Sequence, residues 1–202
     1  MREAAPRTRA AEDGRSSARR GPETREAIDG AAVELIAYGI GMGHYQKRGY
    51  HATSMREIGA TAGIQPAAIY HWYPSKEAIL VRLQDDFMER LTEQVVAALE
   101  RQTRPALRLA AAVREHVIYH GLHPREAFVT DSEIRALAPR PRAALIAQRD
   151  GYEEIFAAEI RAGVEDGSLR SSDPAVATYA ILLQCTGVAL WFDPRGSLSL
   201  DE

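Results

Sequence analysis

A turn between two short helices is predicted within residues 49–77, which read GYHATSMREIGATAGIQPAAIYHWYPSKE. Thr53 or Ser54 can cap the first helix, and Glu57, three residues after Ser54, completes a capping-box pattern. Gly63 suits the left-handed backbone conformation that ends a helix. The first helix is therefore expected to stop at a tight glycine turn.

The second helix is expected to follow that turn directly. Pro66 can occupy its first turn, where no amide hydrogen is needed, and Ile64 and Ile69 are expected to point inward. Helices near 54–61 and 66–72 about a glycine turn form a helix-turn-helix. The second helix of such a motif can lie in the DNA major groove, with its N-terminal residues toward the base edges.

Polar and aromatic side chains gather on this motif. Hydroxyls, amides and cations at helix starts can hold phosphates, and small alanines allow close approach to a thymine methyl. The aromatic side chains could instead pack the helices together; we favour packing for Tyr73 and exposure for Tyr70, His71 and Trp72. The expected DNA-binding residues are Ser54, Arg56, Gln65, Pro66, Ala67, Ala68, Tyr70, His71, Trp72 and Lys76.

The rest of the chain is predicted to be all-α. Apolar residues recur at helical spacing between proline, glycine and serine signals, with no convincing alternating strand and no internal repeat. A helix is expected from near Thr24, and Ser75 is expected to cap a long one. First-turn prolines predict further helices over about 105–120, 124–137, 141 to 163 or 167, and 174–192.

This pattern divides the chain into three parts. Residues 1–22, rich in Arg, Ala, Ser, Gly and Pro, predict a disordered basic tail. Residues 23–80 form the expected three-helix domain that contains the helix-turn-helix, and residues 81–202 a larger helical domain. Ser199 and Glu202 make a capping-box pattern that normally begins a helix, so we expect a final helix to be missing from the sequence.

Composition narrows the class of protein. The chain has 202 residues, of which 46% are hydrophobic and 26% charged, as is typical of a globular protein. Its one cysteine, Cys185, rules out an internal disulfide framework and fits a reducing compartment, so a cytoplasmic protein is expected. No uninterrupted apolar run approaches a membrane span, and no membrane partner is expected. The arginine-rich tail suits nucleic-acid contact as well as a simple solvated tail.

Residues 54–80 closely resemble the DNA-binding domain of TetR-family transcriptional regulators. The family pattern is matched at Ser54, Ile58, Ala62, Gly63, Ile64, Tyr70, Tyr73, Ser75, Lys76, Glu77 and Leu80. The resemblance implies an all-helical dimer with one helix-turn-helix per subunit and a C-terminal domain that binds a small effector. It implies phosphate contacts by Ser54 and Lys76, while Gly59, Gln65 and Ala67 depart from the usual residues.

The region before the motif is longer than in that family. Residues 31–37 look like the family's first helix, and the roughly nine extra residues after it amount to about two and a half helical turns. A simple extension would therefore turn the apolar face away from the core. Either residues 38–46 bulge out, or the first helix is re-registered with Ile40, Met42 and Tyr45 inward.

A ligand pocket is predicted in the C-terminal domain. Aromatic and polar residues mix there on helix faces that ought to be buried. Core packing is the alternative for each residue singly, and buried Tyr152 and Gln184 would need hydrogen-bonding partners. The expected pocket residues are Tyr119, Phe128, Tyr152, Gln184, Trp191 and Phe192.

This half is also similar to a branch of the family that regulates lipid and sterol breakdown and often responds to acyl-CoA thioesters. The similarity lies in residues 123–137, 149–152 and 191–198. Asp193 stands where that branch has an arginine, and its carboxylate would repel a CoA phosphate unless Arg195 compensates.

Enzyme functions fit the sequence poorly. The spaced glycines within 39–43 follow no strand, so they do not predict a phosphate loop, and no nucleophile elbow is present. His116, His120 and His123 share one helical face and, with a neighbouring glutamate, could bind zinc. Histidines also gather at helix ends because they interact favourably with the helix dipole, so no metal site and no cofactor are predicted.

The sequence therefore predicts a ligand-responsive repressor. Two subunits would dimerise through their last helices as a four-helix bundle and present two recognition helices to a pseudo-palindromic, double-stranded DNA operator. A small apolar effector, with acyl-CoA thioesters as one class, would favour a helix arrangement that releases the operator. The alternatives are a ligand-binding or protein-interaction module that has lost DNA binding, and a histidine-based metal enzyme.

Overall fold

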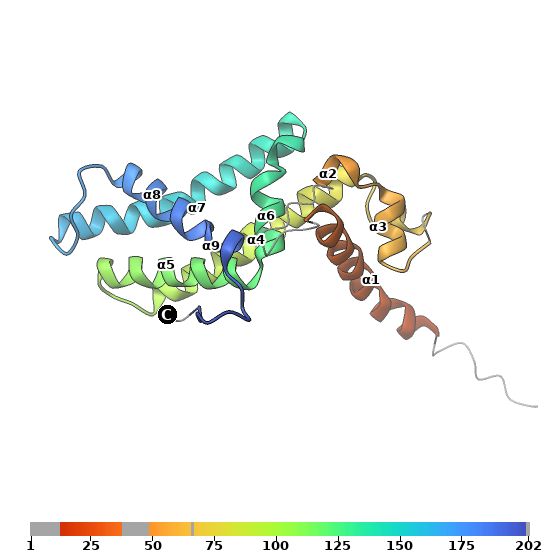
Figure 1. Ribbon diagram of the computed structural model, residues 1–202, viewed down its shortest axis with the longest axis horizontal. Helices are drawn as coiled ribbons and strands as arrows, with labels where there is room; N and C mark the ends of the chain where they lie inside the picture. Colours follow the sequence, from red (N-terminus) through yellow and green to blue (C-terminus); the bar gives the residue numbers. More distant parts are fainter. Residues whose placement is uncertain (1–12, 38–48, 66, 201–202) are drawn as a thin grey trace, which may run out of the picture.

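The computed structural model describes residues 13–37, 49–65 and 67–200, and within these ranges it contains helices and no strand. The all-α prediction is confirmed. Figure 1 shows α1–α3 at one end of the molecule and α5, α7 and α8 at the other, with α4 running between them. The elements are α1 (Asp13–Ile36), α2 (Gly49–Ala52), α3 (Met55–Thr61), η1 (Ala68–His71), α4 (Lys76–Glu100), α5 (Pro105–Leu122), α6 (Pro124–Ser132), η2 (Ile134–Ala136), α7 (Pro139–Glu165), α8 (Pro174–Thr186) and α9 (Val188–Trp191).

The first helix is longer than the sequence indicates. It begins at Asp13 rather than near Thr24 and carries Pro22 inside it. A proline favours a helix boundary because it cannot donate to the carbonyl four residues earlier, yet here the helix continues through it. Residues 13–22, which the sequence assigned to a disordered tail, thus lie within α1. Residues 1–12, and the two alternatives for residues 38–46, lie outside the described residues.

The predicted capping box and glycine turn are confirmed. The Ser54 hydroxyl accepts a hydrogen bond from the Glu57 amide at 3.2 Å, and the Glu57 carboxylate accepts one from the Ser54 amide at 2.9 Å. Gly63 has φ 71°, a left-handed conformation that disfavours other residues. The second helix differs from prediction, because η1 is a single 3₁₀ turn rather than an α-helix over 66–72. Pro66 itself lies outside the described residues.

The long helices of the C-terminal part start where their caps and prolines predict. The Ser75 hydroxyl accepts from the Ala78 amide at 3.1 Å and caps α4. Pro105, Pro124 and Pro174 are the first residues of α5, α6 and α8. A proline suits this position because the first-turn amides have no intrahelical partner.

Other helix boundaries differ from prediction. α7 begins at Pro139 rather than Pro141, since either proline can stand in a first turn. α6 ends at Ser132 and is followed by η2, so no single helix runs over 124–137. The helix expected to reach Phe192 divides at Gly187 into α8 and α9, in keeping with the low helix propensity of glycine.

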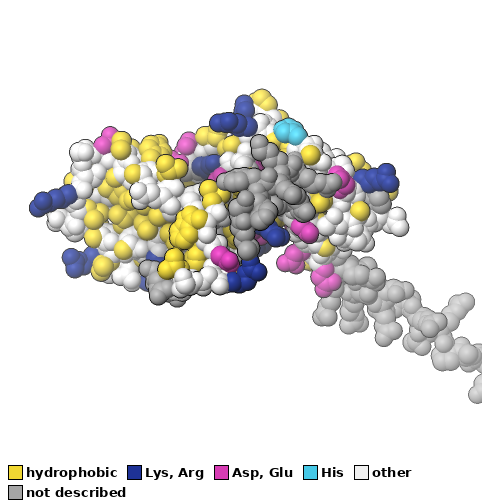
Figure 2. Space-filling model, viewed as in Figure 1, with side chains coloured by type: hydrophobic (Ala, Val, Ile, Leu, Met, Phe, Trp, Pro, Cys, Tyr) yellow, Lys and Arg dark blue, Asp and Glu magenta, His cyan; other side chains and the backbone are white. Residues whose placement is uncertain are grey.

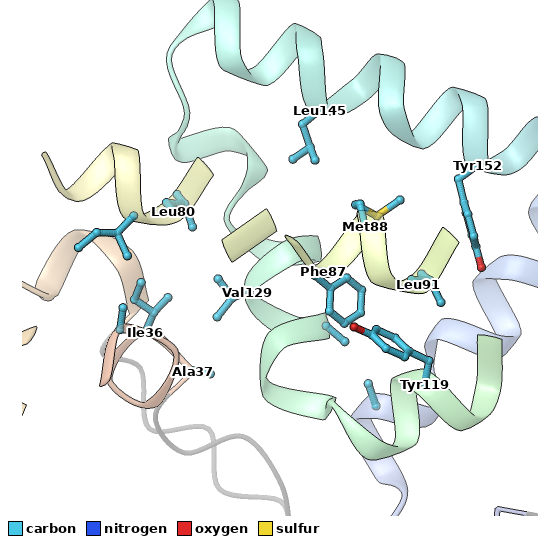
Figure 3. Close-up of a cluster of buried hydrophobic side chains, with 14 of the residues drawn as sticks. Ile36, Ala37, Leu80, Phe87, Met88, Leu91, Tyr119, Val129, Leu145 and Tyr152 are labelled. Atoms are coloured by element: carbon cyan, nitrogen blue, oxygen red, sulfur yellow. The ribbon is translucent and has the colours of Figure 1, made fainter. Parts of the chain in front are cut away.

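One hydrophobic core joins the two ends of the molecule. Ile58 of α3 and Phe156 of α7 are fully buried members of the same cluster. Figure 3 shows part of this cluster passing from Ile36 of α1, by Leu80 of α4, to Tyr119 of α5. The helix-turn-helix end is therefore packed continuously onto the C-terminal helices.

The α8–α9 segment leaves a large apolar surface uncovered. Pro174–Trp191 is an 18-residue stretch that is long and apolar enough to cross a membrane by length and composition, with a mean hydropathy of 1.4. The stretch is not an uninterrupted apolar run, since Thr178, Gln184 and Thr186 lie within it. Leu183 is 79% exposed and Trp191 is 64% exposed, and Figure 2 shows hydrophobic side chains gathered at this end. Because α8 also packs against α5 and α7, it is part of the helical fold with one open face.

Candidate DNA interface and ligand cavity

The helix-turn-helix presents its polar residues outward. Ile58 of α3 and Ile69 of η1 are fully buried, which fixes both elements against the core. Tyr70 is 58% exposed on η1, and His71 beside it is exposed. The predicted exposure of these two residues is confirmed. The other exposed members of the predicted DNA-binding set are Ser54, Arg56, Gln65 and Ala67.

The two aromatic residues after His71 pack inward. Tyr73 is buried, as predicted, and its hydroxyl donates to the Asp29 carboxylate of α1 at 2.6 Å. Trp72 is half-buried, with the Arg25 guanidinium 5.8 Å from its ring centroid. The predicted exposure of Trp72 is wrong because the chain leaving η1 turns under α1. Ala68 is also half-buried.

Lys76 has an internal partner that the sequence did not indicate. Its ammonium donates to the carbonyl oxygens of Tyr50 and Thr53, each at 2.7 Å, and lies 4.2 Å from the Tyr50 ring centroid. Burial lowers its pKa, although Glu133 and Glu57 favour the charged form. The side chain thus ties α2 to the start of α4. Two of its three N–H groups are used, and a phosphate contact stays a prediction for the third.

A second polar joint, made of two hydrogen bonds, connects the helix-turn-helix end to the C-terminal helices. The Tyr50 amide at the start of α2 donates to the Glu133 carboxylate at 3.2 Å. The Ala138 amide before α7 donates to the Glu77 carboxylate of α4 at 2.6 Å. Their partners Glu133 and Ala138 are the first and last residues of the connection between α6 and α7.

A cavity of about 520 Å³ lies among α4, α5, α7 and α8. Its wall combines apolar side chains with a small polar group, which is the usual make-up of a site for a small organic molecule. The residues that line it are Phe87, Met88, Leu91, His116, His120, Asp131, Arg149, Tyr152, Glu153, Tyr179, Leu182, Leu183 and Thr186.

A buried hydrogen-bonded chain crosses the cavity wall. His116 of α5 lies with Nδ1 2.7 Å from the Tyr152 hydroxyl of α7 and Nε2 3.1 Å from the Thr186 hydroxyl of α8. The His120 ring stacks on His116 at 4.0 Å. Burial, with the neighbouring ring, lowers the pKa of His116 to about 2, and burial lowers that of His120 to about 4. Burial raises the pKa of Tyr152, so all three groups are neutral near pH 7.

An ion pair closes another part of the wall. The Arg149 guanidinium donates to the Asp131 carboxylate at 3.1 Å and to the Thr130 carbonyl at 2.6 Å. Burial raises the pKa of Asp131, while the charge and hydrogen bond of Arg149 act in the opposite direction. The two charges largely offset each other, which leaves Glu153 as the other carboxylate of the lining.

The structure separates the six predicted pocket residues. Tyr152 lines the 520 Å³ cavity, whereas Tyr119 lines a smaller cavity of about 240 Å³ beside α1. Gln184 and Trp191 are exposed, contrary to the expectation that they are buried; Phe128 and Phe192 are partly buried and lie outside both linings. Aromatic content alone therefore did not locate the pocket.

Of the three histidines that suggested zinc, His116 and His120 line the 520 Å³ cavity, whereas His123 lines the smaller one. Both ring nitrogens of His116 face hydroxyl groups, and His120 Nδ1 lies 2.9 Å from the His116 carbonyl oxygen. The described part of the chain holds no group of three His, Cys, Asp or Glu residues placed to bind a metal ion. The zinc alternative is therefore dropped. The i, i+4 histidine pair on an apolar helix was the one sequence signal that could have located the cavity.

The charge of Asp193 is compensated by Arg195, the partner that the sequence suggested. Its carboxylate lies 3.4 Å from Arg195 Nε and also accepts from the Arg195 amide at 2.9 Å. The amide of Gly196 donates to the Asp193 carbonyl at 2.8 Å, which confirms the predicted turn after α9.

Comparison with known proteins agrees with this architecture. Residues 44–83 match the family model "Bacterial regulatory proteins, tetR family", and residues 102–202 match "Tetracyclin repressor-like, C-terminal domain". The chain is 29% identical to the transcriptional repressor KstR2 of Rhodococcus jostii (strain RHA1) over 164 residues, 78% of each protein.

Solved structures show the same fold. The regulator PfmR of Thermus thermophilus has a TM-score of 0.75 and 30% identity, with 86% of this chain and 90% of that chain covered. AibR, solved with isovaleryl coenzyme A and operator DNA, has a TM-score of 0.77 and 26% identity, with 88% and 92% covered.

A helix-turn-helix joined to a helical domain with an internal cavity defines a DNA-binding transcriptional regulator, and the relatives of this chain are regulators rather than enzymes. The chain belongs to the TetR family of bacterial transcriptional regulators.

Proposed function

We propose that the protein is a ligand-responsive repressor that binds a pseudo-palindromic operator as a dimer and releases it when a small apolar effector fills the 520 Å³ cavity. DNA contact is assigned to residues 23–80 and effector binding to residues 81–202, in the cytoplasm at the nucleoid. The relative AibR supports the two binding roles, because its structure holds both isovaleryl coenzyme A and operator DNA.

The observation that carries the proposal is the course of α4. Its first residue, Lys76, holds the carbonyl oxygens that end α2, and its middle residues Phe87, Met88 and Leu91 form part of the cavity wall. A ligand pressing on that wall acts on the same rigid helix that positions the helix-turn-helix. Release requires only that the ligand binds one arrangement of α4 better than the other.

The exposed set on α3 and η1 is assigned to DNA. Ser54 and Arg56 are placed to hold phosphates, and Gln65, Ala67, Tyr70 and His71 to meet base edges. Ala68, Trp72 and Lys76, which are half-buried, remain in the proposed interface as its edge. Pro66 lies outside the described residues and stays a predicted contact.

The open apolar face of α8 and α9 is assigned to the second subunit. Tyr179 and Leu183 belong both to this face and to the cavity lining. A partner helix laid across them would bury the exposed surface and narrow the cavity mouth. Trp191 and Gln184 would lie in this interface rather than in the pocket.

Acyl-CoA thioesters are the first effectors to test. AibR was solved with isovaleryl coenzyme A, and the cavity has the apolar lining that an acyl chain needs. The Asp193 charge is met by Arg195, which lowers the repulsion that this departure from the branch pattern would otherwise cause.

A gel shift with the promoter of the protein's own gene tests DNA binding. We expect retardation that weakens steeply with salt, because phosphate contacts release counterions. The double variant Tyr70→Ala, His71→Ala should lose specific binding by about tenfold or more and keep most non-specific binding. Adding acyl-CoA thioesters of increasing chain length should release the retarded band.

The alternative of a module that has lost DNA binding has one observation in its favour, the short 3₁₀ turn at η1. Absence of retardation at low salt, with the chain folded and dimeric, would favour that module. Equal loss of specific and non-specific binding in the double variant would argue against base contacts by η1.

A further inference from the structure

A hydrogen-bond acceptor on the cavity wall has no partner among the described residues of the protein. His120 is 3% exposed and lines the 520 Å³ cavity. Its Nδ1 lies 2.9 Å from the His116 carbonyl oxygen. A carbonyl only accepts, so in the neutral ring Nδ1 carries the hydrogen and Nε2 carries a lone pair. Within the described residues, no group makes a hydrogen bond to Nε2.

The neighbouring groups cannot supply that partner. Both nitrogens of His116 are engaged with Tyr152 and Thr186, and its ring lies flat against His120. The edge-on ring of Phe87 covers another side at 5.4 Å between centroids. A ligand that fills the cavity covers this nitrogen, and leaving a covered acceptor unsatisfied is unfavourable, so a ligand that donates to it is favoured over one that does not.

The charge state of His120 sets what it can recognise. Burial lowers its pKa to about 4, so near pH 7 the ring is neutral and Nε2 accepts rather than donates. A carboxylate offers no hydrogen to this nitrogen, and an ether, ester or aldehyde oxygen offers none either. A hydroxyl group does.

We infer that the cavity selects an uncharged hydroxyl group on an otherwise apolar ligand, donating its hydrogen to His120 Nε2. The inference rests on the proposed function in taking this cavity as the effector site. It adds a requirement that apolar shape alone does not impose, since Met88 and Leu91 on the same wall accept any hydrocarbon of suitable size.

Matched probes can test this requirement on the full chain without DNA. Decanol, decyl methyl ether and decanal share a hydrocarbon chain, but decanol alone carries a donor. Titration calorimetry should give decanol about tenfold tighter binding than either of the others, the effect of one well-placed buried hydrogen bond. Equal affinities would overturn the inference and leave the sensor function standing. Failure of all three to bind would overturn both.

Two variants assign the preference to His120. His120→Phe keeps a flat ring and removes the acceptor, so the preference for decanol should disappear. His120→Gln can place an amide oxygen near the position of Nε2 and should retain a preference. Persistence of the full preference in His120→Phe would overturn the assignment. If His120→Phe does not fold, the comparison of probes on the unaltered chain still decides the matter.

Discussion

The two ends of the molecule use polar side chains in opposite ways. On α3 and η1, Arg56, Tyr70 and His71 face outward while isoleucines hold the elements in place. In the C-terminal helices, His116 and Tyr152 are buried and hydrogen-bond to each other in the wall of a cavity. DNA has to be reached at a surface, whereas a small apolar molecule has to be enclosed. The same residue types therefore lie in two different settings, which suit the two recognition roles that we propose.

The shared core sets the largest effect that we predict. Phe156 is fully buried in α7 and packs against the Tyr152 and His116 rings. Phe156→Ala should lower the free energy of unfolding by about 3–5 kcal/mol, from lost burial and the cavity left behind. Since the cluster also holds Ile58, both ends should unfold together.

The two tryptophans make this prediction measurable. Trp191→Phe leaves Trp72, at the DNA-binding end, as the remaining tryptophan of the chain. In that background, the urea midpoint reported by Trp72 fluorescence should fall with Phe156→Ala. Leu122→Ala, at a 62% exposed position on α5, should change it little. An unchanged Trp72 midpoint with Phe156→Ala would mean that the ends unfold independently.

The buried histidines predict the next largest effect, a loss of stability in acid. The pKa of His120 is lowered from 6.5 to about 4, so below pH 6.5 the unfolded chain binds a proton that the folded chain does not. Stability is thus retained above pH 6.5 and falls as pH drops toward 4. His120 alone should account for about 3 kcal/mol at pH 4.

Urea unfolding between pH 7 and pH 4 measures this loss, with His120→Phe as the matched variant. The variant should lose about 3 kcal/mol less over that range. The raised pKa of Asp131 favours the folded state as pH falls, which opposes the effect of His120. This contribution is the same in the unaltered chain and in the variant. If the unfolding free energies of the unaltered chain and of His120→Phe fall equally between pH 7 and pH 4, His120 is accessible to protons in the folded state.

The contrast between the two ends also explains what the sequence could predict. Local signals specified the first end: Ser54 and Glu57 formed their capping box, and Gly63 took its left-handed turn. Such signals depend on residues a few positions apart. The length of η1 and the inward turn of Trp72 depend on packing under α1, which no local pattern encodes.

The second end could be predicted only in its helices. The cavity is made where α4, α5, α7 and α8 meet, so its lining depends on long-range packing. Six residues were expected there, and Tyr152 is the one that lines it. The spacing of His116 and His120 suggested only an alternative metal site, because the sequence does not reveal that Tyr152 and Thr186 face His116.

Lys76 allows a sharper separation of structural and DNA-binding roles. Lys76→Met keeps the alkyl chain but removes the hydrogen bonds to the Tyr50 and Thr53 carbonyls. We expect a loss of about 1.5–3 kcal/mol in unfolding free energy, the usual range for hydrogen bonds to a charged group. Arg56→Met, at an exposed position, should leave stability unchanged and weaken operator binding. Similar unfolding free energies for Lys76→Met and Arg56→Met would contradict a structural role for Lys76.

The smallest predicted effect concerns the second joint between the ends. Glu133→Ala removes the acceptor for the Tyr50 amide and should cost about 0.5–1.5 kcal/mol, while Glu133→Gln, which keeps an acceptor oxygen, should cost less. If α4 carries the response from cavity to DNA, the effector concentration that releases operator should stay within about twofold in both variants. Loss of release in Glu133→Ala alone, with operator affinity retained, would instead assign the coupling to this joint. Titrating effector into the protein–operator complex, monitored by fluorescence anisotropy, distinguishes the two routes.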